Sequence, residues 1–418
     1  MENGQILQDI TFLIENYQND YYNMEDMKGL LYDAVNEILE MAVSHGFEGD
    51  LWHNYLTYLM ASHENAYSTS CEIVGSVDGS INQVALHDFE IFKELFDYDF
   101  TDMESVMGVD CISMLHDYVG TCGHGSVFNQ RIRDRICDLS KSLAKAETAE
   151  EFKAVITQFY KEFGVGKLGL HKAFRIAHTE EGALIEPITK IAHVHLDDLV
   201  GYEIAKKKLI DNTKAFVEGK KANNCLLFGD AGTGKSSSIK AILNQYYDQG
   251  LRMIEVYKHQ FQDLNDVIAQ IKNRNYKFII YMDDLSFEEF EIEYKYLKAV
   301  IEGGLEKKPD NILIYATSNR RHLVRETFRD KQDRDEELHT NDTVQEKLSL
   351  VARFGVKIYF ASPAKKAFQK IVTELAKRNH ISMPEEELLL EVNKWELSHG
   401  GMSGRTAQQF IDYLLGKE

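Results

Sequence analysis

The sequence predicts an α/β protein, with a parallel sheet followed by a small helical subdomain and preceded by a mostly α-helical N-terminal domain. Beyond residue 198, β-rich runs alternate with helical segments, which is the pattern of strands joined by crossover helices. From Pro363 onward only helical patterns remain. The chain has 418 residues, too many for one ordinary core, so we expect more than one domain.

The region up to residue 185 reads as mostly helical. Leu30–Ala42 and Glu147–Phe163 carry apolar residues at three- and four-residue spacing. None of the four prolines precedes Pro187, so long helices can run uninterrupted. The stretch Ile73–Ser80 contains glycine and serine and predicts a loop or a short hairpin.

The acidity of the chain is concentrated at its N-terminal end. Residues 1–110 hold 22 acidic residues and two lysines, which accounts for the whole net charge of -20. Such a surface repels phosphate backbones, so a non-specific nucleic-acid site is not expected there. A surface for a basic protein partner and an ordinary solvated surface both fit this composition.

Other features of the sequence predict a cytoplasmic protein without a membrane partner. No run approaches the roughly 20 apolar residues that cross a bilayer, and the first residues lack the basic start of a secretory signal. The five cysteines are odd in number and scattered, which favours reduced thiols in a cytosol.

The β-rich runs are short and apolar, as expected for strands covered on both faces. They are Cys225–Phe228, Met253–Tyr257, Phe278–Met282, Ile312–Ala316 and Val356–Phe360. Three amphipathic helices follow them, at roughly 363–379, 385–398 and 403–416.

A glycine loop follows the first predicted strand and precedes a predicted helix. Residues 229–236, GDAGTGKS, match the pattern G-x-x-x-x-G-K-[ST] in full. Its glycines let backbone N–H groups surround an anion, and the helix N-terminus adds its dipole. The pattern predicts that Lys235 bridges nucleotide phosphates and that the Ser236 hydroxyl ligates Mg²⁺. The expected nucleotide-binding residues of the loop are Gly229, Ala231, Gly232, Thr233, Gly234, Lys235, Ser236 and Ser237.

Paired acids end the predicted strand Phe278–Met282. Asp283 suits a metal ligand, and Asp284 suits polarising the attacking water. Such a pair can also act as a helix cap, but its position after the glycine loop favours the metal site.

Two further patterns lack the context that their chemistry needs. Residues 164–169 fit G-x-G-x-x-G but follow a helix, so we expect a helix–helix turn and no dinucleotide site. Cys111, His116, Cys122 and His124 are ligand types for zinc, but their spacing matches no common zinc scaffold.

Residues 192–418 resemble the AAA+ ATPases. The resemblance implies a sheet of order 5-1-4-3-2 and hydrolysis of ATP with Mg²⁺. The segments DLVGYE, GDAGTGKSS, MDDLSFEE, YATSNRRHL and SGRTAQQF are together similar to a bacterial AAA+ group catalogued as domain of unknown function 815. We therefore expect a helical N-terminal domain at 1–190, a nucleotide-binding domain at 191–361 and a helical lid at 362–418.

The resemblance also implies roles for residues outside the glycine loop. Asn319 would orient the lytic water, and Arg405 would reach the γ-phosphate from the lid. Arg353 resembles an arginine finger that acts on a neighbouring subunit, which implies a homo-oligomer. The residues expected near adenine are Val200, Gly201 and Tyr202. Ion pairing at the surface is the alternative for either arginine, and a strand-end cap is the alternative for Asn319.

The chain departs from the AAA+ pattern at two positions. Asp284 stands where most members have Glu, so Glu288 or Glu289 could contribute to activating the water. Ala352 stands where the group usually has an acid before the finger arginine. Arg320 and Arg321 are therefore competing finger candidates. The charged stretch 326–347 reads as an exposed insertion or a partner-contact loop.

Three functions fit these patterns. The first is an ATPase that remodels or regulates a protein client held by the N-terminal domain. The second is a nucleotide-gated assembly switch with little turnover, which Asp284 and Ala352 permit. The third is a nucleic-acid loader of the replication type, which the acidic N-terminal region disfavours.

Overall fold

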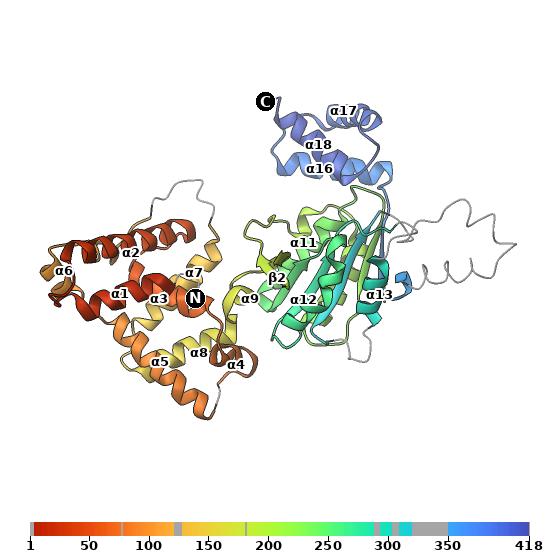
Figure 1. The fold of residues 1–418 in the computed structure, drawn as a ribbon. Coiled ribbons are helices and arrows are strands. Elements are labelled where there is room, and N and C mark those ends of the chain that lie inside the picture. The colour runs from red at the N-terminus through yellow and green to blue at the C-terminus, as the bar shows by residue number, and fades with distance from the viewer. Residues whose placement is uncertain are drawn as a thin grey trace. The chain divides into compact units, whose positions relative to one another are not determined.

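The computed structural model describes residues 4–76, 78–120, 128–179, 182–287, 293–302, 309–319 and 350–417. Packing divides the chain into two compact units, Met1–His171 and Lys172–Glu418. Figure 1 draws the first unit in red to yellow and the second in yellow-green to blue. None of the helices in these residues has both the length and the apolar character that a bilayer crossing requires.

The first unit is built from helices. Its α-helices are α1 (Gly4–Asn16), α2 (Met24–His45), α3 (Leu51–Ser62), α4 (Ala66–Val74), α5 (Ser80–Phe96), α6 (Thr101–Met107), α7 (Gln130–Leu143), α8 (Ala149–Phe163) and α9 (Gly166–Leu170), with a 3-10 turn at Ser113–Leu115. Side-chain caps explain several starts: Asn23, Asp50 and Thr148 each accept a backbone N–H from the first turn. Large aromatic residues, Trp52 and Tyr55 among them, fill the core.

Most local predictions for this unit are confirmed. The segment Leu30–Ala42 lies within α2, and the segment Glu147–Phe163 ends with α8 but begins two residues before it. The G-x-G-x-x-G pattern spans the turn from α8 into α9, where Gly164 follows the last residue of α8 with φ +78°. The described residues between α4 and α5 form a loop and no hairpin.

The second unit contains a seven-stranded sheet. Its strands are β1 (Ala173–Thr179), β2 (Gly182–Pro187), β3 (Cys225–Gly229), β4 (Leu251–Glu255), β5 (Lys277–Met282), β6 (Ile312–Ser318) and β7 (Val356–Phe360). They are ordered β2-β1-β4-β5-β6-β3-β7. The five parallel strands from β3 to β7, numbered in chain order, therefore run 5-1-4-3-2 across the sheet, as predicted.

Strands β1 and β2 correct the sequence analysis. We expected residues 173–187 to lie within the helical region 1–190, but they form an antiparallel hairpin. Strand β1 pairs in parallel with β4, Phe174 opposite Ile254, so the hairpin extends the sheet beyond the expected edge. Arg175 and Glu186 pair across the hairpin on its exposed side. The hairpin consequently belongs to the α/β unit.

Helices cover both faces of the sheet (Figure 1). Helices α10 (Glu203–Val217) and α11 (Lys235–Tyr246) pack on one face, where Leu209 and Ile242 meet Leu227 and Ile279. Helices α12 (Leu264–Ile271) and α13 (Glu293–Glu302) lie against the other. Short 3-10 turns lie at Leu196–Asp198, Tyr247–Gln249 and Lys258–Asp263. Two-sided cover explains the continuous apolar runs in the strands.

A three-helix lid follows β7. Its helices are α16 (Lys365–Arg378), α17 (Glu385–Ser398) and α18 (Gly404–Leu415), close to the predicted ranges. They share a small core in which Phe368 and Phe410 are fully buried. Helix α18 starts at a side-chain cap, because Ser403 Oγ accepts the backbone N–H of Thr406 at 3.0 Å.

Candidate functional site

The glycine loop connects the end of β3 to the first residue of α11. Gly229, Gly232 and Gly234 all adopt positive φ, a conformation that residues other than glycine rarely adopt. A Cβ on Gly229 would clash with the carbonyl oxygen of Phe360, and one on Gly232 would lie 2.9 Å from Ser403 Oγ. Gly229 and Gly232 are thus required because neighbouring atoms approach them closely, as well as for their backbone conformation.

Lys235, the one cation of the loop 229–236, is buried, with 6% of its surface exposed. Its Nζ donates to the carbonyl oxygens of Gly229 at 3.0 Å and Asp230 at 2.6 Å, and to Asn319 Oδ1 at 2.9 Å. Burial lowers the pKa of this ammonium, and the nearby carboxylates, Asp284 foremost, act against the shift. A cation held this way can exchange its oxygen partners for the oxygens of a phosphate.

Asp283 lies opposite the hydroxyl of Ser236. Ser236 Oγ donates to Asp283 Oδ1 at 2.7 Å, and Thr317 Oγ1 donates to the same oxygen at 2.6 Å. Burial alone would raise the pKa of Asp283, but the bonds from Thr317 and Ser236 outweigh it and the pKa is lowered. An ionised carboxylate beside a hydroxyl is a hard-oxygen donor set that fits Mg²⁺.

Asp284 has a left-handed backbone, with φ +50°. Its N–H donates to Thr317 Oγ1 at 2.9 Å, and its Oδ1 accepts from Asn319 Nδ2 at 2.7 Å. The next residue is also tied to β6, because the N–H of Leu285 donates to the carbonyl oxygen of Thr317 at 2.7 Å. Non-glycine residues in this conformation are uncommon and are often found at functional sites.

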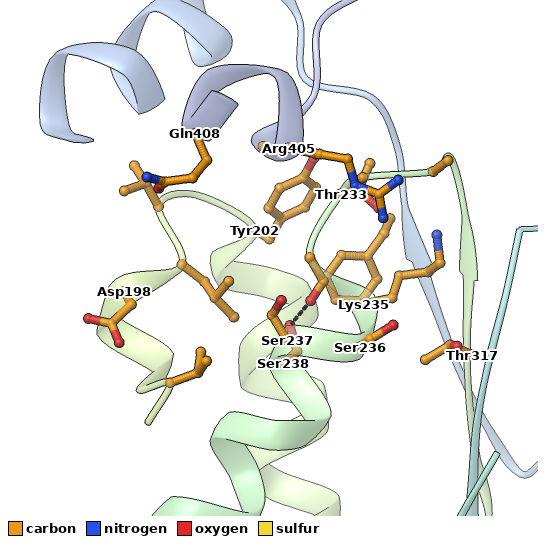
Figure 2. A pocket seen from close by; sticks show the side chains of 18 of the residues that line it. Asp198, Tyr202, Thr233, Lys235, Ser236, Ser237, Ser238, Thr317, Arg405 and Gln408 are labelled. Carbon is orange, nitrogen blue, oxygen red and sulfur yellow. Dashed lines mark hydrogen bonds between the residues drawn. The ribbon is translucent and has the colours of Figure 1, made fainter. Parts of the chain in front are cut away.

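These residues line a cavity of about 790 Å³ that extends from the loop to the lid. Figure 2 shows Arg405 reaching from α18 toward Lys235 at the start of α11, whereas Gln408 of the same helix lies on the side of Asp198. The backbone N–H of Arg405 donates to the carbonyl oxygen of Gly232 at 3.1 Å, which joins lid and loop directly. Predicted residues that line the cavity are Val200, Tyr202, Ala231, Gly232, Thr233, Gly234, Lys235, Ser236, Ser237, Asp283, Asp284, Asn319 and Arg405.

Several lining residues were missed from the sequence. Thr317 is the most informative, since a hydroxyl at the end of the strand beside β5 is a signal that could have found it. An apolar wall comes from Val194, Leu199, Ile371 and Leu375, and a polar edge from Asp198, Lys206 and Gln408. The wall joins segments before the loop and in the lid, a convergence that only the folded chain supplies.

Tyr202 ties the segment before α10, which lines one side of the cavity, to the start of the lid. Its φ is +60°, and its hydroxyl donates to the carbonyl oxygen of Ala361 at 2.9 Å. Burial raises the pKa of this phenol to about 12, so it stays a donor at neutral pH.

Other predicted residues lie elsewhere. Gly201, Gly229 and Arg353 are not among the described residues that line the cavity. Arg353 is half-buried and lies just after the helical residues 350–352 and before β7. The roles predicted for Arg320, Arg321, Glu288, Glu289 and the stretch 326–347 are not tested, because these residues lie outside the described ones.

The zinc pattern is tested only in part, because Cys122 and His124 lie outside the described residues. His116 Nδ1 is hydrogen-bonded to Asp50 Oδ2 at 2.6 Å. Within the described ranges, no group of three or more metal-ligating side chains comes together.

Comparison with solved structures finds AAA+ domains of low sequence identity. The FIGL-1 AAA domain in complex with ADP matches with a TM-score of 0.37 and 16% identity over 54% of this chain and 75% of that one. Two variants of Thermotoga maritima RuvB match with TM-scores of 0.34 and 0.33 and identities of 13% and 14%, each over 53% of this chain and 72% of theirs. No curated protein matches the chain.

The fold class rests on features within the chain. The strand order, the glycine loop after β3 and the three helices after β7 together form the arrangement that the resemblance to AAA+ proteins implied. A family model described as "Protein of unknown function (DUF815)" matches residues 169–418, more than half of the chain. The chain therefore belongs to this family, as the sequence resemblance indicated.

Proposed function

We propose that the chain binds ATP with Mg²⁺ at this cavity and hydrolyses it to remodel or regulate a protein partner. One observation carries the proposal: Lys235, Asn319 and Asp284 form a continuous hydrogen-bonded chain beside the Ser236–Asp283 pair. A cation, a hydroxyl, two acids and a polar amide are the groups that phosphoryl transfer needs around a terminal phosphate.

Each group has a task that follows from its position. The backbone N–H groups of the loop and Lys235 would hold the phosphate oxygens, which leaves the terminal phosphate facing Asp284. Ser236 and Asp283 would hold Mg²⁺, which supplies charge neutralisation at the phosphates. Arg405 would add a cation from the lid side of the same cavity.

Water activation is assigned to Asp284 and Asn319. The carboxylate would accept a proton from the attacking water, and the amide would hold that carboxylate and the water in line. The bond between Asn319 and Asp284 already fixes the direction of the carboxylate. This arrangement favours hydrolysis of the nucleotide over transfer of phosphate to a second substrate.

We propose that hydrolysis requires assembly of the chain. Arg353 does not line the cavity among the described residues, so it would have to act on the nucleotide of a neighbouring subunit. A permanently charged guanidinium from a neighbour would stabilise the charge on the transferring group. Homo-oligomerisation would then switch on turnover.

We also propose that the first unit binds the protein partner. It is a separate compact unit, and its first 110 residues carry the acidity of the chain. It also holds a cavity of about 260 Å³ lined mainly by apolar residues, including Met60, Val84 and Phe92. Apolar lining within an acidic unit suits a partner that offers an apolar side chain among basic ones.

Phosphate release tests the enzymatic part of the proposal. We expect release by the wild type and none above background by Lys235→Ala, because the phosphate-binding cation is gone. Asp284→Asn should retain the nucleotide but release little phosphate. The exposed Lys208 on α10 gives a matched control, and Lys208→Ala should behave as the wild type. Equal release by wild type and Lys235→Ala would refute hydrolysis at this site.

A nucleotide-gated switch is the second candidate. Asp is one methylene shorter than Glu, and the backbone of Asp284 has a left-handed conformation, which favours slow turnover. This function predicts nucleotide-dependent assembly with negligible phosphate release. Sedimentation with and without MgATP, beside the release assay, separates the two functions.

A further inference from the structure

Asp230, the second residue of the glycine loop, is hydrogen-bonded through three of its atoms. Its N–H donates to the carbonyl oxygen of Phe360 at 3.0 Å. Its carbonyl oxygen accepts from Thr233 Oγ1 at 2.8 Å and from Lys235 Nζ at 2.6 Å. Its carboxylate Oδ2 accepts the backbone N–H of Ser362 at 2.7 Å. One residue thus connects the phosphate-binding lysine to the chain that leaves β7.

The segment Phe360–Ala364 joins the sheet to the lid. Strand β7 ends at Phe360, and α16 begins at Lys365. On the base side, Tyr202 donates to the carbonyl oxygen of Ala361. On the phosphate side, Asp230 holds both Phe360 and Ser362. Each peptide group from 360 to 362 is therefore held by a residue that lies next to the proposed nucleotide site.

The three hydrogen bonds that Lys235 donates cannot all survive phosphate binding unchanged. A lysine Nζ has three donors, and all three are taken by Gly229, Asp230 and Asn319. If Lys235 donates to phosphate oxygens, at least one of these acceptors must be released. Release at Gly229 or Asp230 changes the loop at the residues that contact Phe360 and Ser362.

We propose that Asp230 is a positioning residue that couples phosphate binding to the lid, through the hydrogen bond from the Ser362 backbone to its carboxylate. This inference rests on the proposed nucleotide site and adds a route by which its occupancy reaches α16. The side chain does not touch the reacting atoms in this scheme. It fixes where the lid leaves the sheet.

The chemistry at Asp230 favours a hydrogen-bonding role over a general charge effect. The Ser362 hydrogen bond is the main cause of a lowered pKa at Asp230, so the carboxylate is ionised at neutral pH and the bond is charge-assisted. Asparagine can still accept at this position, whereas alanine cannot. Rescue by asparagine therefore separates a specific hydrogen bond from the loss of negative charge.

Hydrogen exchange at the junction tests the coupling in the full-length chain. Pro363 has no amide, so a peptide covering residues 359–364 reports on few sites, Ser362 among them. Without nucleotide, we expect Asp230→Ala to speed exchange at Ser362 about 10-fold and Asp230→Asn to change it less than about threefold. The exposed Asp266 on α12 gives the control, and Asp266→Ala should leave the junction unchanged.

Adding MgATP completes the test. In the wild type it should slow exchange both at the start of α11 and at Ser362. In Asp230→Ala the slowing should persist at α11 and disappear at Ser362, while Asp230→Asn should restore it. Unchanged slowing at Ser362 in a folded Asp230→Ala, or none in a wild type that binds MgATP, would overturn the inference. Absence of slowing at α11 in the wild type would instead reject the nucleotide site itself.

Should Asp230→Ala fail to fold, Asp230→Asn and Ser362→Ala still decide the matter. Ser362→Ala keeps the backbone N–H and removes only the hydroxyl, so the slowing by MgATP should remain. Its loss in Ser362→Ala, with normal binding at α11, would show that the hydroxyl and not the backbone bond connects loop and lid, and would contradict the inference.

Discussion

The side-chain amide of Asn319 donates a hydrogen bond to the carboxylate of Asp284 across 2.7 Å. The other atom of the same amide accepts from Lys235 at 2.9 Å. Only one orientation of the amide satisfies a cation on one side and an anion on the other, so its direction is set by charge. The end of β6 therefore aligns the base candidate with the phosphate-binding cation.

Replacing this amide should slow the chemical step. We expect Asn319→Ala to reduce the rate of phosphate release by about 100-fold, because the carboxylate and the water lose their alignment. MgATP affinity should change far less, since Lys235 keeps its charge. Steady-state phosphate release and equilibrium binding, measured on the same preparation, give the two numbers. Loss of affinity equal to the loss of rate would contradict a role limited to water alignment.

The lowered pKa of Asp283 makes a prediction about acid stability. Its pKa lies below the ordinary 3.8, so the unfolded chain takes up this proton first as the pH falls. The stabilisation by ionised Asp283 is complete above the pKa of the unfolded chain and is lost as the pH drops through the lower pKa of the folded chain. We expect Asp283→Asn to show a smaller fall in Tm than the wild type between about pH 5 and pH 3. Thermal melts at several pH values check this, and parallel curves for the two proteins would contradict it.

Substitution of Gly232 by alanine tests whether contact between the lid and the loop matters for MgATP binding, apart from the cost in backbone conformation. Alanine at a left-handed position costs about 1–2 kcal/mol of folding free energy, and this cost applies equally to Gly232 and Gly250. A Cβ at Gly232 also meets Ser403 and Arg405, whereas nothing lies within 4 Å of one at Gly250. Gly232→Ala should therefore weaken MgATP binding by about 10-fold, and Gly250→Ala should leave it intact.

Titration of MgATP into both glycine variants, with their Tm values, checks this pair. Similar losses of Tm with a loss of affinity only in Gly232→Ala are expected. Equal affinities would mean that the lid does not rest on the loop when nucleotide is bound.

Arg353 should act between subunits. Arg353→Ala keeps an intact glycine loop, and Lys235→Ala keeps an intact arginine, so neither should release phosphate alone. Mixed oligomers should recover part of the activity, because some intact loops then face an intact arginine. Phosphate release from the mixture checks this. An assembled mixture without recovered activity would exclude Arg353 as the residue supplied by the neighbour.

The sequence was sufficient where a local pattern determines a local structure. The loop 229–236 was predicted because its glycines, lysine and serine are needed at fixed positions between a strand and a helix. Helix α17 was predicted to the residue, since Pro384 and three glutamates mark its first turn. Strand order followed from family resemblance and not from the strands themselves.

Features that depend on distant partners were missed. The place of the hairpin β1–β2 is set by pairing with β4, which no local pattern encodes. Thr317 was not singled out, because its role depends on β6 placing its hydroxyl against Asp283 on the neighbouring strand. Gln408 and the apolar wall needed the lid to be set against the segment before the loop. Convergence of separate segments is the part of the site that sequence reading did not supply.

Calorimetric titration of MgATP into the full-length chain tests the account most directly. The wild type and Lys208→Ala should bind with the same affinity. Lys235→Ala, once a melting curve has shown that it is folded, should give no binding heat. Binding that is unchanged in Lys235→Ala, or absent from the folded wild type, would contradict a nucleotide site at the glycine loop.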